Sequence, residues 1–178
     1  MIKSANYIHL FKRKQDTKAE FIRVDHAGEL GAKYIYLGQL KVLKGETQIV
    51  EMLESEMEHL DYFEDYIKRE NVRPSVLNSL WKECAFLMGF LSARIYKKSG
   101  AMLCTKEVED VIEKHYEKQI KILDDLKLNE DLKNKIIKFR EDEISHFKIG
   151  QSESIANRTF SIAVKSITHL AIILSKKF

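Results

Sequence analysis

The sequence predicts an all-α protein that forms a single domain. Proline occurs once and glycine only seven times in 178 residues, so turn-forming residues are sparse and long helices are favoured over many short strands. Apolar residues recur at helical spacing in six segments, and no segment shows the two-residue alternation of a strand. No Gly/Ser-rich stretch indicates a linker, and the length suits one domain with a substantial core.

The first predicted helix covers about residues 17–44 and follows a basic N-terminal extension, residues 1–16. The segment Thr17-Lys-Ala-Glu20 has the form of a capping box, which predicts the start of this helix. A second helix, over about residues 46–70, ends before Pro74, because proline disfavours the helical conformation in the residue that precedes it.

The same periodicity predicts four more helices, over about residues 75–98, 105–126, 129–151 and 160–176. We expect Ser99-Gly100 to close the first of these. The bundle should consist of the segments 17–44, 46–70, 105–126 and 129–151, all within one domain of residues 17–178. The segments 75–98 and 160–176 are then two additional apolar or amphipathic helices.

Each of the four bundle segments carries one glutamate on its apolar stripe. These residues are Glu29, Glu56, Glu109 and Glu143. A carboxylate is costly to bury unless it is paired or binds a metal, and four carboxylates close together would repel one another. Two divalent cations would neutralise the four charges, so the pattern predicts a site for two metal ions.

Two copies of the motif Glu-x-x-His complete the predicted ligand set. His59 follows Glu56 and His146 follows Glu143 by three residues, which places each pair close to one helix face. One such motif in a charged helix is common by chance and usually lies on a solvated surface. Two copies, each preceded by a helix with a stripe glutamate, form the ligand set of a ferritin-like di-iron carboxylate bundle.

The ligand types favour iron or manganese over zinc, because oxygen and imidazole donors with vacant positions suit those metals. By analogy with such bundles, Glu56 and Glu143 would bridge the metals, while Glu29 and Glu109 would each bind one terminally. His59 and His146 would each bind one metal. Their free ring N–H groups need acceptors, for which Asp25 and Asp142 are candidates beside the alternative of exposed surface aspartates.

The sequence resembles the demethoxyubiquinone hydroxylase family from about residue 18 to the C-terminus. The matching stretches are Arg23-Val-Asp-His-Ala-Gly-Glu29, Glu56-Met-Glu-His59-Leu60, Gly100-Ala-Met-Leu-Cys104-Thr105, Val108-Glu109 with His115-Tyr116, and Glu143-Ile-Ser-His146. The first stretch is the most specific, because generic ferritins do not share it. Ser145 and Phe147 depart from the more acidic, His-rich pattern of the family, but neither is a ligand position.

The resemblance implies a di-iron monooxygenase that hydroxylates the demethoxyubiquinol ring in ubiquinone biosynthesis. One atom of O2 would enter the ring and the other would leave as water, with electrons from NADH or from the quinol. His115 and Tyr116 resemble the family's pair linked to electron delivery near the iron, although a core tyrosine beside an exposed histidine explains them equally well. No Gly-x-Gly-x-x-Gly motif follows a strand, so the sequence offers no Rossmann site for NADH.

A polyprenylated quinol lies in the bilayer, so a membrane surface is an expected partner. Residues 84–93 lack charge but are too few to span a membrane, and the face of segment 160–176 suits a helix lying in the membrane plane, as an alternative to core or dimer contacts. Without the four site glutamates, 30 basic residues face 23 acidic ones, a charge of +7 that favours anionic lipid. No basic run interleaves with aromatic residues, so nucleic acid is not an expected partner.

The expected location is the cytoplasmic face of a bacterial inner membrane, as a peripheral protein. The N-terminus shows no signal-peptide pattern, and Cys84 and Cys104 form neither a Cys-x-x-Cys pair nor a disulfide framework, which suits a reducing compartment. A homo-oligomer or a quinone-presenting helper protein are further expected partners. The alternatives are a ferritin-like protein for iron storage or detoxification, and a peroxide-scavenging relative of the rubrerythrins. The second is weakened by the missing Cys-x-x-Cys pairs.

Overall fold

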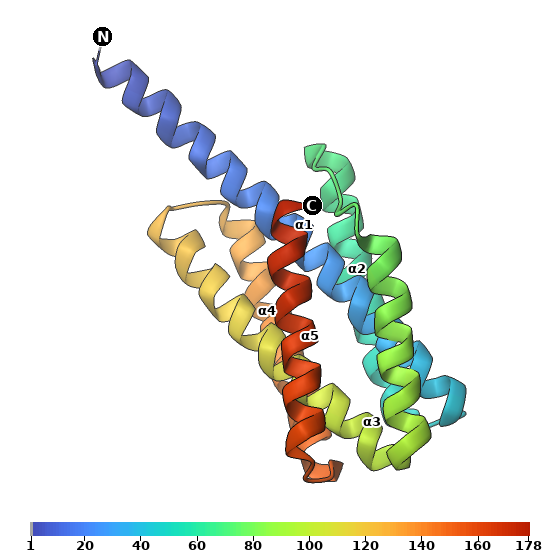
Figure 1. The fold of residues 1–178 in the computed structure, drawn as a ribbon. Coiled ribbons are helices and arrows are strands. Elements are labelled where there is room, and N and C mark those ends of the chain that lie inside the picture. Colours follow the sequence, from blue (N-terminus) through green and yellow to red (C-terminus); the bar gives the residue numbers. More distant parts are fainter. Residues whose placement is uncertain (1) are drawn as a thin grey trace.

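The computed structural model describes residues 2–178, with side chains from Lys14 onward, and this part of the chain contains five α-helices and no strand (Figure 1). The helices are α1 (Ile2–Val42), α2 (Thr47–Glu70), α3 (Asn78–Asp125), α4 (Glu130–Glu153) and α5 (Arg158–Lys177). The predicted all-α bundle is confirmed. α1 packs against α2 and α3, and α3 packs against α4 and α5.

The first helix begins earlier than the sequence predicts. α1 already runs from Ile2, so Thr17 lies inside a helix and does not cap its start. The segment before Thr17 contains neither glycine nor proline, so nothing in it stops a helix from extending toward the N-terminus. The side chains of residues 1–13 lie outside the described part of the chain, and the role of residues 1–16 as a separate extension stays a prediction.

α3 unites the two predicted helices over residues 75–98 and 105–126. Its two arms meet at a kink at Lys97, where φ is 56° and ψ is −145°, and they diverge from this point (Figure 1). The sequence predicts the break at Ser99-Gly100, but the structure places it two residues earlier, at Lys97. Gly100 serves a different purpose, because a Cβ atom there would overlap the Ser92 carbonyl oxygen and the Tyr96 side chain. Its missing side chain lets the second arm start directly against the end of the first.

Two other glycines allow α1 and the first arm of α3 to approach each other closely. A Cβ atom on Gly38 would overlap the backbone of Phe86, and one on Gly89 would overlap the backbone of Ile35. The obstacle in both cases is the backbone of a helix, which cannot move aside as a flexible side chain could. These two positions therefore set the separation of α1 and α3.

We expect Gly89→Ala to destabilise the protein by about 1–3 kcal/mol or more, because the added methyl group forces the two helices apart. The matched control is Gly31→Ala in α1, where a Cβ atom meets nothing within 4 Å. Alanine is the better helix former, so this control should keep or raise stability by up to about 1 kcal/mol. Urea unfolding followed by circular dichroism measures both. Equal stability of the two variants would contradict the close-contact role of Gly89.

Two of the three apolar core clusters in the described part of the chain enclose a layer of charged side chains. One cluster contains Phe21, Ile22, Phe63, Tyr66, Val72, Tyr116, Leu123, Leu132, Ile136 and Phe139. The other contains Ala32, Tyr36, Ile49, Met52, Ala93, Ala101 and Met102. On α1, α2 and α3 the predicted ligand residues lie between these two clusters in sequence. On α4 they lie between Phe139 of the first cluster and the partly buried Ile149, which packs against the second. The apolar packing on both sides therefore keeps water from the charged layer.

The C-terminal helix α5 is held against α1 and α3 by polar contacts near its C-terminal end and near its middle. Near its end, Arg23 of α1 donates a 3.0 Å hydrogen bond to the Lys176 carbonyl oxygen, and Trp81 donates one of 2.9 Å to Ser175 Oγ. Farther back, Lys165 forms ion pairs of 2.7 Å with Asp110 and 3.0 Å with Glu107. α5 is thus fixed along its length over α1 and α3.

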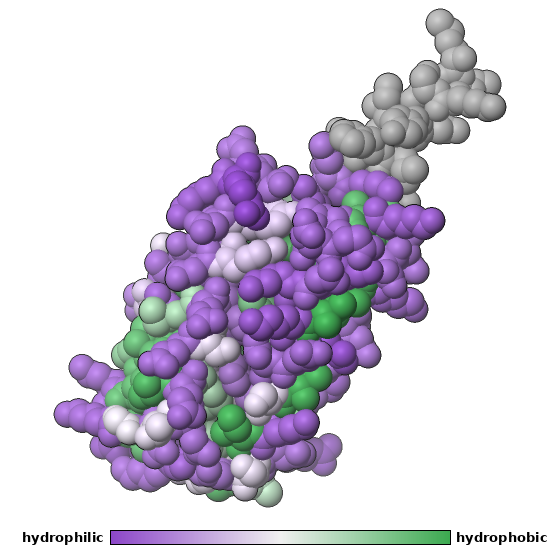
Figure 2. All heavy atoms as spheres, turned by 180° about the vertical axis from the view of Figure 1, so that it is seen from behind, coloured by the Kyte–Doolittle hydropathy of each residue, from purple (hydrophilic) through white to green (hydrophobic). Residues whose placement is uncertain are grey.

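The surface is unevenly polar. The face seen in Figure 2, opposite to the view of Figure 1, is mostly hydrophilic with smaller hydrophobic areas. Exposed large apolar residues recur on the first arm of α3 and on α5, namely Leu80, Leu87, Leu91, Ile95, Ile162, Ile167, Leu170 and Ile173. Across the described residues, none of the helices combines the length and the apolar character needed to traverse a bilayer.

Candidate metal centre

The six predicted ligand residues converge in the middle of the bundle. α1 contributes Glu29, α2 contributes Glu56 and His59, the second arm of α3 contributes Glu109, and α4 contributes Glu143 and His146. All six are buried, with at most 6% of any residue exposed. In α2 and α4 the three-residue spacing puts the glutamate and the histidine on the same helix face, which points to the centre.

The six residues form two overlapping groups of four. In the first group, Glu29, Glu56, His59 and Glu143 each offer a ligand atom, and these atoms lie within 4.8 Å of one another. The second group contains Glu56, Glu109, Glu143 and His146, with atoms that meet the same limit. Glu56 and Glu143 belong to both groups. The two groups therefore resemble two neighbouring four-ligand sites that share two carboxylates.

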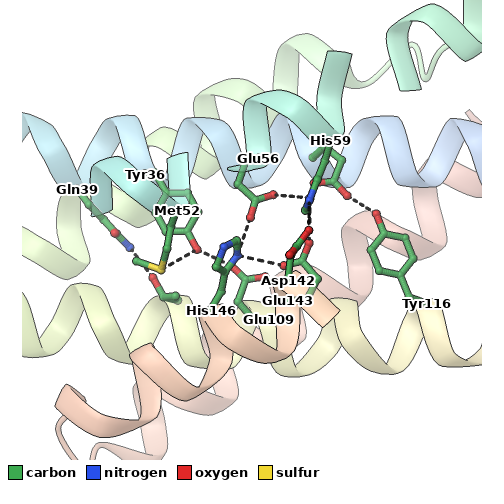
Figure 3. A network of polar contacts seen from close by, with 12 residues as sticks. Tyr36, Gln39, Met52, Glu56, His59, Glu109, Tyr116, Asp142, Glu143 and His146 are labelled. Atoms are coloured by element: carbon green, nitrogen blue, oxygen red, sulfur yellow. Dashed lines mark hydrogen bonds and ion pairs between the residues drawn. The ribbon is translucent and has the colours of Figure 1, made fainter. Parts of the chain in front are cut away.

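The shared carboxylates direct one oxygen atom toward each histidine. Glu56 Oε1 lies 3.0 Å from His146 Nδ1, and Glu56 Oε2 lies 3.8 Å from His59 Nδ1 (Figure 3). Glu143 repeats the arrangement, with distances of 3.4 Å to His59 Nδ1 and 3.5 Å to His146 Nδ1. A carboxylate that bridges two metal ions needs this disposition of its two oxygen atoms.

Many of the ligand atoms have no hydrogen-bond partner in the described part of the chain. They are both carboxylate oxygens of Glu56 and of Glu143, Glu109 Oε2, and Nδ1 of His59 and of His146. Buried polar atoms are nearly always hydrogen-bonded, so seven unpaired ones in a single cluster require an explanation. Two bound cations would coordinate all seven, and the residues present therefore fit a pair of metal ions.

Without a metal, the cluster perturbs the pKa of its own members. Burial, and then the nearby charges of Glu143 and Glu29, raise the pKa of Glu56 well above its usual value. Burial and the charges of Glu143 and Glu56 do the same to the pKa of Glu109. Burial opposes the charged form of His59, but the nearby carboxylates of Glu143 and Glu29 raise its pKa to about 12. The metal-free site thus retains protons that a cation would displace.

Two buried tyrosines each donate a hydrogen bond to a cluster glutamate on another helix. Tyr36 of α1 donates a 2.7 Å hydrogen bond to Glu109 of α3, and Tyr116 of α3 donates one to Glu29 of α1. Burial raises the pKa of both hydroxyls well above the usual value, so both keep their protons. Each tyrosine follows a stripe glutamate by seven residues, at Glu29 and Tyr36 and at Glu109 and Tyr116. Tyr36 is not among the site residues predicted from the sequence, although this repeated seven-residue spacing could have indicated it.

The two candidate acceptors for the histidine rings behave differently. His59 Nε2 lies 3.1 Å from Asp142 Oδ2, which orients the ring so that Nδ1 faces the carboxylates. Asp25 contacts neither His59 nor His146. It accepts a 2.7 Å hydrogen bond from Gln119 instead, because its position on α1 faces the second arm of α3. The prediction is therefore met for Asp142 and wrong for Asp25.

Comparison with known proteins identifies the family. The model of the family described as ubiquinone biosynthesis protein COQ7 matches residues 16–175. The chain belongs to the COQ7 family. The resemblance found in the sequence is thereby confirmed.

Relatives of this COQ7-family chain come from eukaryotes and bacteria. A protein of Dictyostelium discoideum named NADPH-dependent 3-demethoxyubiquinone 3-hydroxylase, mitochondrial, is 40% identical over 93% of this chain and 80% of its own length. A human protein of the same name is 40% identical over 88% of this chain and 76% of its own. A Rhodospirillum rubrum protein named 3-demethoxyubiquinol 3-hydroxylase is 37% identical over the same shares. These matches do not favour the storage and peroxide-scavenging alternatives.

An apolar cavity adjoins the carboxylate cluster of the COQ7-family bundle. It contains about 700 Å³ of space, including its open mouth, and its walls come from α1, both arms of α3 and α5. Glu29 and Tyr116 belong to its lining, together with Trp81, Cys84 and Ile167. Neither Glu109 nor any residue of α2 or α4 lines it. The cavity therefore approaches the cluster from the side of Glu29.

Proposed function

We propose that this chain is a di-iron monooxygenase that hydroxylates demethoxyubiquinol with O2. The observation that carries the proposal is the convergence of Glu56, Glu143 and their four partners, whose unpaired ligand atoms fit two cations, in a chain of the COQ7 family. Relatives at about 40% identity bear the name of this hydroxylase. Glu56 and Glu143, which belong to both four-residue groups, would help to hold both iron ions. Glu29 with His59 would complete one site, and Glu109 with His146 would complete the other.

The bound iron pair would supply the chemistry that activates O2. The protein would hold the ligands in place and exclude bulk water through the apolar clusters on both sides of the charged layer. Manganese accepts the same ligand types, so the metal has to be measured in purified protein. Electrons would come from NADH, from NADPH as the names of the eukaryotic relatives state, or from the quinol itself.

The substrate ring would occupy the apolar cavity beside Glu29. Ligand pockets are typically apolar with a few polar groups, and this cavity has Asp25, Glu29, His115 and Tyr116 in an otherwise mainly apolar lining. His115 and Tyr116 remain candidate catalytic residues. Tyr116 reaches the cluster through its hydrogen bond to Glu29, whereas no hydrogen bond or ion pair joins His115 to a ligand residue in the described part of the chain.

Two native side chains report directly on occupancy of the cavity. Trp81 is the only tryptophan of the chain, and Cys84 is exposed whereas Cys104 is buried. A short-chain quinone analogue should quench Trp81 fluorescence and protect Cys84 from alkylation, because both residues line the cavity. Labelling measured by peptide mass spectrometry, with denatured protein as the control, tests this. A quinone that neither quenches nor protects would place the substrate elsewhere.

The cavity is lined in part by α3 and α5, the helices that carry most of the exposed apolar residues, which favours a peripheral position on a membrane. Leu87 and Leu91 project from the first arm of α3, and Leu170 projects from α5. We propose that this surface contacts the lipid, on the cytoplasmic face of a bacterial inner membrane, so that a quinol can pass from the bilayer into the cavity. Vesicles with anionic lipid should float the protein but not a Leu87→Glu/Leu170→Glu variant. Ile137→Glu on α4 is the matched control.

Complementation tests the proposed activity. Expression of this chain should restore ubiquinone in a bacterial strain that lacks its own 3-demethoxyubiquinol hydroxylase and accumulates demethoxyubiquinone. Purified protein should insert one ¹⁸O atom from ¹⁸O2 into the product, as mass spectrometry can show. Continued accumulation of demethoxyubiquinone, despite folded and metal-loaded protein in the cells, would refute the proposal.

The tyrosine pair provides a test of the two metal positions. Tyr36→Phe should lower the affinity for the metal near Glu109 by about 10- to 100-fold, and Tyr116→Phe should do the same for the metal near Glu29. Each variant removes the hydrogen bond that orients one terminal ligand. Stepwise metal titration of each variant measures the two affinities. If both variants lowered the affinity for both metals to the same extent, the assignment of one tyrosine to each metal would be wrong.

A further inference from the structure

Three polar side chains form a contact outside the carboxylate cluster, at the wall of the cavity. Asp25 of α1 is buried, and its Oδ1 atom accepts a 2.7 Å hydrogen bond from Gln119 Nε2 of α3. The same Gln119 nitrogen lies 3.0 Å from His115 Nε2, one helical turn earlier. The direct distance from His115 Nε2 to Asp25 Oδ1 is longer, at 3.5 Å. The Gln119 amide therefore makes a shorter contact with Asp25 and with His115 than these two side chains make with each other.

This contact restricts where the His115 ring carries its proton. An amide nitrogen can only donate hydrogen bonds, and Gln119 Nε2 has two hydrogens, one for Asp25 and one for His115. The opposite orientation of the amide would direct its oxygen at the Asp25 carboxylate, which also accepts. With the nitrogen in place, His115 Nε2 has to present its lone pair, so the proton of the neutral ring resides on Nδ1.

The other ring nitrogen is available to a ligand. His115 Nδ1 makes no hydrogen bond to the described part of the chain and is not among its buried unpaired atoms. His115 lines the cavity together with Glu29 and Tyr116, in walls that otherwise offer mainly apolar groups. A donor on this residue suits an oxygen substituent of an aromatic ring bound there.

We propose that Asp25 and Gln119 are positioning residues that hold His115 as its Nδ1–H tautomer, so that the ring donates a hydrogen bond to an oxygen atom of a quinone or quinol in the cavity. The second half of this statement rests on the proposed function. The first half depends only on the three side chains. Burial raises the pKa of Asp25, and the neighbouring His115 and the amide hydrogen bond from Gln119 act in the opposite direction.

The tautomer can be measured without turnover. In zinc-loaded protein labelled with ¹⁵N-histidine, the long-range ¹H–¹⁵N spectrum should show His115 protonated at Nδ1, with the signal assigned by its loss in His115→Phe. Asp25→Asn keeps an acceptor for the Gln119 amide and should keep this tautomer. Gln119→Leu removes the donor to Nε2 and should abolish the preference for the Nδ1–H form. A proton on Nε2 of the wild-type ring, or loss of the Nδ1–H form in Asp25→Asn, would overturn the proposal.

Binding provides the second measurement. The dissociation constant of a short-chain quinone, followed by Trp81 quenching in metal-loaded protein, should rise about tenfold in Gln119→Leu and in Asp25→Ala, and less than about twofold in Asp25→Asn. In a His115→Phe background, Gln119→Leu should have no further effect, and an equal effect there would overturn the positioning role. If the quinone fails to quench Trp81 in the wild-type protein, the cavity assignment fails, and the spectrum of His115 still decides the tautomer.

Discussion

Glu143→Ala should abolish most metal binding and reduce hydroxylation to the background rate. Glu143 belongs to both four-residue groups, and its two oxygens lie 3.4 Å from His59 Nδ1 and 3.5 Å from His146 Nδ1. Its loss therefore removes one ligand from each proposed metal and leaves three carboxylates to balance four positive charges. Iron and manganese content by elemental analysis, and product formation from a quinol analogue, measure the effect.

Glu141→Ala is the matched control for this experiment. Glu141 lies on the same helix two residues earlier, but its side chain is exposed and outside the cluster. The control should retain two metals per chain and full activity. Retention of both metals in Glu143→Ala would refute the shared site, and equal losses in the two variants would indicate a general effect on α4 instead.

Metal loading should reverse the pH dependence of stability. In the metal-free protein the pKa values of Glu56 and Glu109 are raised, mainly by burial, so the folded state keeps protons that the unfolded chain loses above about pH 4.5. Stability then falls as pH rises, by up to about 1.4 kcal/mol per pH unit for each retained proton. His59 acts in the same direction from about pH 6.5 upward, because its pKa is raised to about 12.

Two groups modify this expectation without reversing it. Despite burial, the neighbouring His146 and His59 lower the pKa of Glu143 to about 2. The stabilisation that ionised Glu143 provides is therefore constant above about pH 5 and is lost only in acid. Burial lowers the pKa of His26, which adds a smaller rise of stability near its usual pKa. The net slope of the metal-free protein between about pH 5 and about pH 8 should therefore be negative.

Metal binding requires deprotonated ligands. The affinity for the metal, and the stabilisation that metal binding provides, should therefore increase as the pH rises over the same range. Thermal unfolding by circular dichroism, with chelator in one series and Mn²⁺ or anaerobic Fe²⁺ in the other, measures both slopes. Glu109→Gln should flatten the metal-free slope, since glutamine cannot titrate. A metal-free protein that gains stability between pH 5 and 8 would contradict the charge repulsion inferred for the cluster.

The sequence by itself determined the all-α class and the residues that meet at the centre. The periodicity of each apolar stripe identifies the buried face of a helix, and the three-residue spacing of Glu56 and His59 is a property of a single helix. Such a pattern within one helix can be read without knowing which other helices pack against it. It therefore selected Glu29, Glu109 and Glu143 although these residues lie on three different helices.

Only the tertiary structure decided what surrounds those residues. Asp142 rather than Asp25 accepts from a histidine, and Tyr36 crosses from α1 to Glu109, because such contacts depend on the rotation and separation of two helices. The kink at Lys97 and the cavity likewise result from packing. An apolar stripe indicates that a side chain is buried. The residue that this side chain contacts depends on how two helices pack, which involves residues distant in the sequence.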